Sequence, residues 1–308
     1  MKRIAHLFPG QGSQTVGMGR NFFERSELAR ELFLKADEAL GYKLSQLCFE
    51  GPEEELKLTR NTQPALLVVS TIASRLLGGE PALAAGHSLG EYSALVAAGS
   101  LAFEDAVKLV HKRGQYMQEA VPVGEGAMAA LLGAERQAVL DGLARVRSGI
   151  AEVANWNSPE QIVIAGDKAA VEEAVSLIKA PRSVFLPVSA PFHSSLMKSA
   201  EKKLAVDLDR TVFQDLRFPV VTNVDARPIR SGEEARDALK RQVSRPVLWH
   251  ESMDKLKGEG VTHFVELGSG KVLTGLMKRI GRGWPQPFTM LNVEDMESLD
   301  KARAALVT

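Results

Sequence analysis

The pentapeptide Gly86-His-Ser-Leu-Gly90 constrains the possible fold more tightly than any other part of the chain. A short apolar run ends just before it, and an amphipathic, alanine-rich segment begins just after it. Strand, Gly-x-Ser-x-Gly and helix, in that order, form a nucleophile elbow, a turn so tight that it lifts the serine hydroxyl clear of the sheet. We expect Ser88 to hold a strained backbone at a helix N-terminus, where free N–H groups favour developing negative charge. The pattern favours a catalytic serine, and a plain tight turn is the alternative.

The composition of the chain narrows the classes of protein to which it can belong. Lys plus Arg and Asp plus Glu number 38 each, and this balance gives no support for a nucleic-acid or membrane-surface partner. The chain has no apolar leader-type segment and no run of about 18 apolar residues, so we expect a soluble, cytoplasmic protein. The single cysteine, Cys48, excludes an internal disulfide and is expected to be a buried core thiol.

Apolar strands and helical periodicities alternate through most of the 308 residues. We expect strands at 4–8, 81–85, 220–222 and 262–266, and helices at 27–40, 62–77, 91–98, 103–119, 195–208, 232–242, 251–259 and 270–280. Thr62 is the expected N-cap of its helix, with Pro64 in the first turn. The loop Gly10-Gln-Gly-Ser-Gln14 lacks the lysine and the spacing of a phosphate loop. This alternation predicts an α/β fold with a mostly parallel sheet covered on both faces.

A composition break at residues 121–126 interrupts this alternation. Shorter units follow, with strands expected at 127–132, 150–156, 161–166 and 183–188 and helices at 135–147 and 168–179. Their βαββαβ order is that of a ferredoxin-like unit. We therefore predict a small inserted domain at 123–189 and a large domain made of 1–122 and 190–308.

A serine hydroxyl is a poor nucleophile until a base takes its proton, and histidine is the usual base. His193 lies in a loop just after the last strand of the predicted insert, at a sheet rim where catalytic groups gather. It is the favoured base, although a position near a helix N-cap would also explain it. His87 adjoins the serine but should point away from it, in a structural role. We expect His6 and His263 to be packed within apolar strands. His111 is expected on a solvated helix face.

Several further motifs occur in one fixed order over almost the whole chain. They are Gly10-Gln-Gly-Ser-Gln14, Gly86-His-Ser-Leu-Gly-Glu-Tyr-Ser93, Arg113-Gly114, Asn155-x-Asn-Ser158, Pro191-Phe-His193, Thr222-Asn-Val-Asp225, Arg241-Gln-Val-x-x-Pro246-Val-x-Trp249 and Glu266-Leu-Gly-x-Gly270. In this combination the chain resembles the malonyl-CoA:acyl carrier protein transacylases of bacterial type II fatty acid synthesis. The resemblance implies an α/β-hydrolase-like core with an inserted ferredoxin-like small domain.

The resemblance also implies roles for individual residues. Ser88 matches the nucleophile that carries the malonyl ester, and His193 matches its general base. Gln242 matches a glutamine whose main-chain carbonyl holds that histidine, in place of the acidic third member of a hydrolase triad.

Three further residues match groups that bind the substrate. Arg113 matches an arginine that holds the free malonyl carboxylate, and a planar guanidinium can do so with two parallel charge-assisted hydrogen bonds. A surface helix charge is the simpler explanation of such an arginine. The backbone N–H groups of Gln11 and Leu89 match the oxyanion hole.

The implied reaction is a ping-pong acyl transfer. Malonyl-CoA acylates the serine, coenzyme A leaves, and the phosphopantetheine thiol of holo-acyl carrier protein attacks the ester. We expect a monomer that needs neither a metal nor a bound redox cofactor, the coenzyme A thioester being a substrate. A basic patch for the acidic carrier protein is expected near the cleft, at Lys198, Lys202 and Lys203. The two alternative functions are a serine esterase and a catalytically silent docking module.

Overall fold

The computed structural model describes residues 2–188 and 190–307, so predicted boundaries at 1, 189 and 308 lie outside it. Its larger sheet has the strand order β10-β9-β1-β2-β7-β8. The strands are β1 (Ile4–Phe8), β2 (Leu83–Gly86), β7 (Val220–Val221), β8 (Pro228–Ile229), β9 (His263–Leu267) and β10 (Thr289–Val293). All neighbours are parallel except β7 and β8. The predicted mostly parallel sheet is confirmed.

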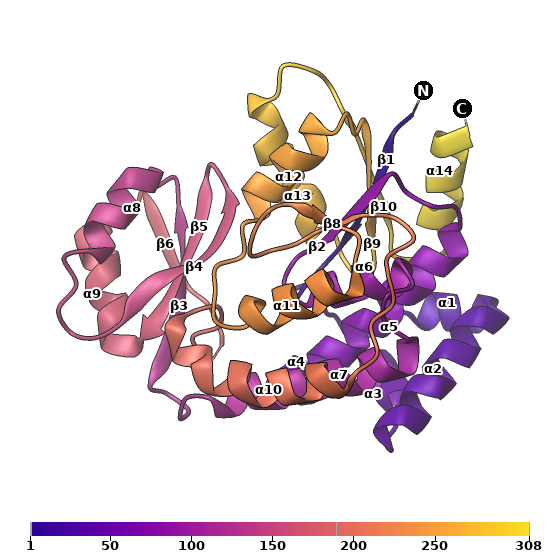
Figure 1. The fold of residues 1–308 in the computed structure, drawn as a ribbon, viewed down its shortest axis with the longest axis horizontal. Helices are drawn as coiled ribbons and strands as arrows, with labels where there is room; N and C mark the ends of the chain where they lie inside the picture. The colour runs from indigo at the N-terminus through magenta and orange to yellow at the C-terminus, as the bar shows by residue number, and fades with distance from the viewer. Residues whose placement is uncertain (1, 189, 308) are drawn as a thin grey trace.

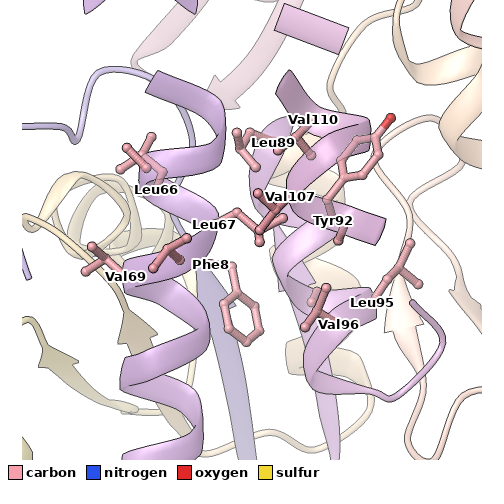
Figure 2. Packing of buried hydrophobic residues seen from close by; sticks show 14 of the residues in the cluster. Phe8, Leu66, Leu67, Val69, Leu89, Tyr92, Leu95, Val96, Val107 and Val110 are labelled. Carbon is pink, nitrogen blue, oxygen red and sulfur yellow. The ribbon is translucent and has the colours of Figure 1, made fainter. Parts of the chain in front are cut away.

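Both faces of this sheet are buried, and alternate residues of β1 show why. Phe8 belongs to a core cluster with α5 (Thr59–Leu77), α6 (Leu89–Ala97) and α7 (Phe103–Glu119), and Figure 2 shows its ring between α5 and α6. Ala5 and Leu7 point the other way, into a cluster with α12 (Trp249–Gly258) and α13 (Val272–Ile280). The remaining helices are α1 (Arg20–Arg25), α2 (Glu27–Leu40), α3 (Leu44–Glu50), α4 (Glu53–Lys57), α10 (Lys198–Arg210), α11 (Gly232–Gln242) and α14 (Met296–Val307). Cys48 is buried, as expected.

The second sheet is antiparallel, with the order β4-β5-β3-β6 (Figure 1). Its elements are β3 (Gly126–Leu132), α8 (Arg136–Leu143), β4 (Ala151–Ser158), β5 (Gln161–Asp167), α9 (Lys168–Ile178) and β6 (Arg182–Phe185). The βαββαβ prediction is therefore confirmed, while the domain boundaries themselves stay a prediction.

The small sheet is bonded to the large unit along one strand. The main chain of Val247, which precedes α12, exchanges 2.9 Å hydrogen bonds with Trp156 N–H and the Ala154 carbonyl of β4. Side chains on one face of the small sheet, including Met128 and Val163, also join the cluster that contains Phe8. One face of each sheet therefore contributes to the same packed cluster.

The helix predicted to begin at Thr62 begins one turn earlier, so the predicted N-cap is wrong. The Thr62 hydroxyl is buried and donates to the Leu56 carbonyl instead. Pro64 lies inside the helix and has no N–H for the Arg60 carbonyl, which accepts a 2.9 Å hydrogen bond from Nδ1 of His111. His111 is thus half-buried and bonded, not a freely solvated residue as predicted.

Several other predicted elements differ at their ends. The strand expected at 183–188 is Arg182–Phe185, the helix expected at 135–147 ends at Leu143, and the helix expected at 195–208 opens with a 3₁₀ turn at Ser195–Met197. Strand β10, helix α14 and the short helices α1, α3 and α4 were not predicted. No helix of the described residues is long and apolar enough to span a membrane.

Candidate functional site

Ser88 lies two residues after the end of β2 and immediately before α6, in a turn that excludes side chains on either flank. Its backbone is at φ 51° and ψ −104°, a conformation that L-residues rarely adopt, as the elbow pattern predicts. A Cβ on Gly86 would lie 1.9 Å from the Gly90 carbonyl carbon, and one on Gly90 would lie 2.0 Å from the Phe8 carbonyl oxygen. Both glycines are therefore required by the close approach of backbone to backbone.

His193 faces the serine from the loop that follows the small sheet. Its Nε2 lies 2.8 Å from Ser88 Oγ, and its Nδ1 lies 2.9 Å from the main-chain carbonyl oxygen of Gln242. Because a carbonyl can only accept, Nδ1 carries the hydrogen, and the lone pair on Nε2 is directed at the serine hydroxyl. Burial, together with the positive charge of Arg113, lowers the pKa of His193 to about 3. The imidazole is thus neutral at physiological pH.

Arg113 projects from α7 beside the serine and is 1% exposed. Its Nη2 donates to Ser88 Oγ at 3.1 Å and to Gln242 Oε1 at 2.9 Å, and its guanidinium carbon lies 5.3 Å from the centre of the Tyr92 ring. Nε has no hydrogen-bond partner among the described residues, and none of their carboxylates lies within ion-pair distance of the guanidinium. A buried guanidinium with free donors is suited to hold a carboxylate that the substrate supplies.

The N–H groups of Gln11 and Leu89 border the space in front of the serine. Gln11 follows β1, and Leu89 opens α6, where the first N–H groups of a helix lack intrahelical acceptors. Neither N–H donates a hydrogen bond within the described part of the chain. Both residues line a cavity of about 120 Å³ together with Ser88, Arg113 and His193.

A second cavity, of about 520 Å³, adjoins the first. The two share four lining residues, namely Gln11, Leu186, Val188 and Phe192. The second is also lined by Lys57 and Lys168, whose ammonium groups suit an anionic ligand. The larger cavity therefore borders the space in front of the serine.

Other predicted residues lie outside the reacting group. His87 has its Nε2 2.8 Å from Asn157 Oδ1 and its ring against Trp249, which fits the structural role expected of it. Lys198, Lys202 and Lys203 line neither cavity. Lys198 pairs with Glu201 and Lys203 with Glu119, and a role of this patch in docking the carrier protein stays a prediction.

Sequence reasoning missed two residues that hold the site together. The Asn223 side chain closes the elbow, because its Oδ1 accepts from Ser88 N–H at 2.7 Å and its Nδ2 donates to the Gly86 carbonyl at 2.7 Å. Glu91, 1% exposed, accepts hydrogen bonds from Asn223 N–H and from the Gln242 side chain. Both lie in motifs that the sequence displays. The sequence pattern that could have pointed to Glu91 is a carboxylate in the first turn of an otherwise apolar helix.

Comparison with known proteins gives consistent results. Residues 5–299 match the family model described as the acyl transferase domain. The chain is 47% identical to the malonyl CoA-acyl carrier protein transacylase of Bacillus subtilis (strain 168), over 98% of this chain and 96% of that protein. The solved structure of the malonyl CoA-acyl carrier protein transacylase of Coxiella burnetii is 40% identical, with a TM-score of 0.96 over 100% of this chain and 98% of the other.

A solved complex of a malonyl-transacylase with its type II PKS acyl-carrier protein, in the holo form, is also similar. Its matching chain is 44% identical, with a TM-score of 0.95 over 99% of this chain and 100% of the other.

Proposed function

The chain belongs to the malonyl CoA-acyl carrier protein transacylases, and we propose that it moves the malonyl group through an ester on Ser88, with His193 as the base. It is an acyltransferase of fatty acid synthesis that uses malonyl-CoA and acyl carrier protein. One observation supports the proposed residue roles above all. His193 Nε2 and Arg113 Nη2 both lie within 3.1 Å of Ser88 Oγ.

In the first half-reaction, His193 Nε2 takes the Ser88 hydroxyl proton as Oγ attacks the thioester carbon of malonyl-CoA. The negative charge that develops on the carbonyl oxygen is stabilised by the N–H groups of Gln11 and Leu89. The carbon–sulfur bond then breaks, and His193 returns its proton to the sulfur of coenzyme A. The malonyl group remains as an ester on Ser88.

In the second half-reaction, the phosphopantetheine thiol of holo-acyl carrier protein gives its proton to His193 Nε2 and attacks the ester carbon. The bond from Ser88 Oγ breaks, and Oγ recovers the proton from the imidazole. The Gln242 carbonyl keeps Nδ1 protonated throughout, so Nε2 is always the atom that exchanges the proton. A neutral carbonyl orients the ring without adding negative charge beside an anionic substrate, whereas a serine esterase would place a carboxylate here.

Arg113 selects a donor that carries a free carboxylate. The guanidinium is buried and no carboxylate of the described residues pairs with it directly, so a malonyl carboxylate would satisfy its free donors, whereas an acetyl group would leave them unpaired. Specificity is the difference between the transition-state free energies for the malonyl and acetyl donors. The arginine therefore contributes to specificity by stabilising the malonyl transition state more than the acetyl one.

Arg113→Ala tests this proposal. We expect kcat/KM for malonyl-CoA to fall about 10- to 100-fold, the effect of losing about 1.5–3 kcal/mol of charge-assisted hydrogen bonding, and kcat/KM for acetyl-CoA to fall far less. Lys112→Ala is a matched control, because Lys112 is the next residue of α7 and pairs with Asp207 at the surface. Equal losses on both donors would mean that Arg113 has a structural role only.

We also propose a cytoplasmic monomer with a large domain of 1–122 and 190–308 and a small domain of 123–189. The reacting groups Ser88, His193 and Arg113 all come from one chain, which supports a monomer as sufficient for activity. Sedimentation at working concentration, with activity measured on the same sample, tests the oligomeric state.

A further inference from the structure

Glu91 is a buried carboxylate that the two half-reactions do not use. Its Oε2 accepts two hydrogen bonds, from Asn223 N–H at 2.9 Å and from Gln242 Nε2 at 2.8 Å, while its Oε1 has no hydrogen-bond partner among the described residues. Burying a carboxyl group is costly unless its bonds recover the lost hydration. Both bonds from Glu91 lead towards the reacting groups.

The first bond fixes the orientation of the Gln242 amide. Its Nε2 faces oxygen acceptors only, namely Glu91 Oε2 at 2.8 Å, the Ser88 carbonyl at 3.0 Å and Asn223 Oδ1 at 3.3 Å. Its Oε1 accepts from Arg113 Nη2 at 2.9 Å. A flipped amide would set its oxygen against these acceptors and its NH₂ against the guanidinium. Glu91 therefore directs the Gln242 oxygen at Arg113.

The amide also keeps the two buried charges from pairing directly. Glu91 and Arg113 are joined through Gln242, and within the described part of the chain Nη2 is the guanidinium nitrogen that hydrogen-bonds to the protein. Burial raises the pKa of Glu91 to about 7, and the charge of Asp225 acts in the same direction. The two hydrogen bonds to Glu91 and the charge of Arg113 lower the pKa and only partly offset burial. Either protonation state of the carboxyl retains an oxygen that can accept from Gln242 and Asn223.

The second bond reaches the elbow. Glu91 holds the backbone N–H of Asn223, whose side chain bridges Ser88 N–H and the Gly86 carbonyl. The same loop is anchored on its outer side by two hydrogen bonds from Arg241 to Asp225, at 2.9 and 2.7 Å. A disturbance transmitted along this branch moves the serine itself, and so acts on every acyl donor alike.

We propose that Glu91 is a positioning residue which, through the Gln242 amide, holds the Arg113 guanidinium with its free edge turned towards the carboxylate of the acyl donor. The inference rests on the proposed role of Arg113. Because the Asn223 branch affects all donors equally, the ratio of kcat/KM for malonyl-CoA to that for acetyl-CoA isolates the branch through Gln242 and Arg113.

Two substitutions of similar shape test the proposal. Glu91→Gln keeps an oxygen at the Oε2 position and should keep the malonyl-to-acetyl ratio within about threefold of wild type, whereas Glu91→Met removes the acceptor and should lower the ratio about tenfold, which corresponds to about 1.4 kcal/mol. Glu266→Met is the matched control. Glu266 is also buried and accepts from Leu273 N–H and Thr274 N–H at the start of α13, so its loss should lower the melting temperature and leave the ratio unchanged.

The outcomes separate this inference from the proposed function. A wild-type ratio in Glu91→Met, beside a lowered ratio in Arg113→Ala, would overturn the inference and leave the proposed function standing. A ratio lowered equally in Glu91→Gln and Glu91→Met would also overturn it. Equal losses on both donors in Arg113→Ala would remove the proposed role of the arginine itself. If Glu91→Met does not fold, Gln242→Met breaks the same link while keeping the main-chain carbonyl, and a wild-type ratio there overturns the inference.

Discussion

Gly90→Ala should disable the site by sterics alone, without removing any reacting group. The added Cβ would lie 2.0 Å from the Phe8 carbonyl oxygen and 2.7 Å from its carbon, and both atoms belong to the backbone of a central strand. The first separation is about 1.4 Å short of the 3.4 Å at which ordinary van der Waals contact begins. The Phe8 oxygen also accepts the 2.9 Å hydrogen bond from His87 N–H that holds the elbow on β1. Helix α6 and the elbow must therefore move away from the strand.

The size of this movement sets the expected effect. Overpacking of this kind costs about 1–3 kcal/mol, so the melting temperature should fall by several degrees. A shift of about 1 Å in a reacting group lowers rates about 100-fold, so formation of the acyl-enzyme should slow by that order. The affected distance is the 2.8 Å contact of Ser88 Oγ with His193 Nε2.

The assay compares thermal melting and single-turnover acylation by malonyl-CoA in Gly90→Ala and Gly275→Ala. Gly275 lies inside α13, where an added Cβ meets nothing within 4 Å, so its substitution should stabilise the protein by about 0.5–1 kcal/mol and leave acylation unchanged. A Gly90→Ala protein with the melting temperature and acylation rate of wild type would refute the steric reasoning.

Three further predictions concern the reacting pair. Ser88→Ala should form no malonyl adduct, and an adduct seen by mass spectrometry on the variant would reject Ser88 as the nucleophile. His193→Ala should slow both half-reactions about 10²- to 10⁴-fold while malonyl-CoA binding changes little, and wild-type turnover would assign the base to another histidine. Because the active form of His193 is neutral and its pKa is lowered to about 3, kcat/KM should stay nearly constant from pH 7 to pH 5. An ordinary pKa of 6.5 would instead leave only about 3% of the imidazole neutral at pH 5, and kcat/KM would fall accordingly.

The parts of the fold that sequence could predict are those with a strong local signal. The elbow is specified by two glycines and a serine over five residues, and the βαββαβ unit by regular spacing of apolar runs. Helix α5 shows the limit of local signals, because Thr62 and Pro64 resemble a helix start. In the structure the Thr62 hydroxyl donates to the Leu56 carbonyl six residues earlier, and the Arg60 carbonyl accepts from His111, 51 residues later in the chain. The His111 partner is not visible in a local window.

The site divides in the same way. Residue type and loop position pointed to Ser88 and His193 from chemistry alone, whereas Arg113 was distinguished from a surface charge only by resemblance. The predicted roles of these residues, and of Gln11, Leu89 and Gln242, stay predictions. Glu91 and Asn223 could not be placed, because their bonds span 132 to 151 residues of sequence and depend on how α6, α11 and the loop after β7 meet.

Ser88 and His193 are 105 residues apart, and the whole small sheet lies between them in the sequence. Bringing the nucleophile to its base therefore requires closing a chain segment of 105 residues that contains β3 to β6. Contacts of such long range form late when loop closure governs folding. Reactivity of Ser88 with a serine-directed reagent, sampled during refolding, would therefore time the formation of this long-range contact, which a spectroscopic probe of helix content does not report.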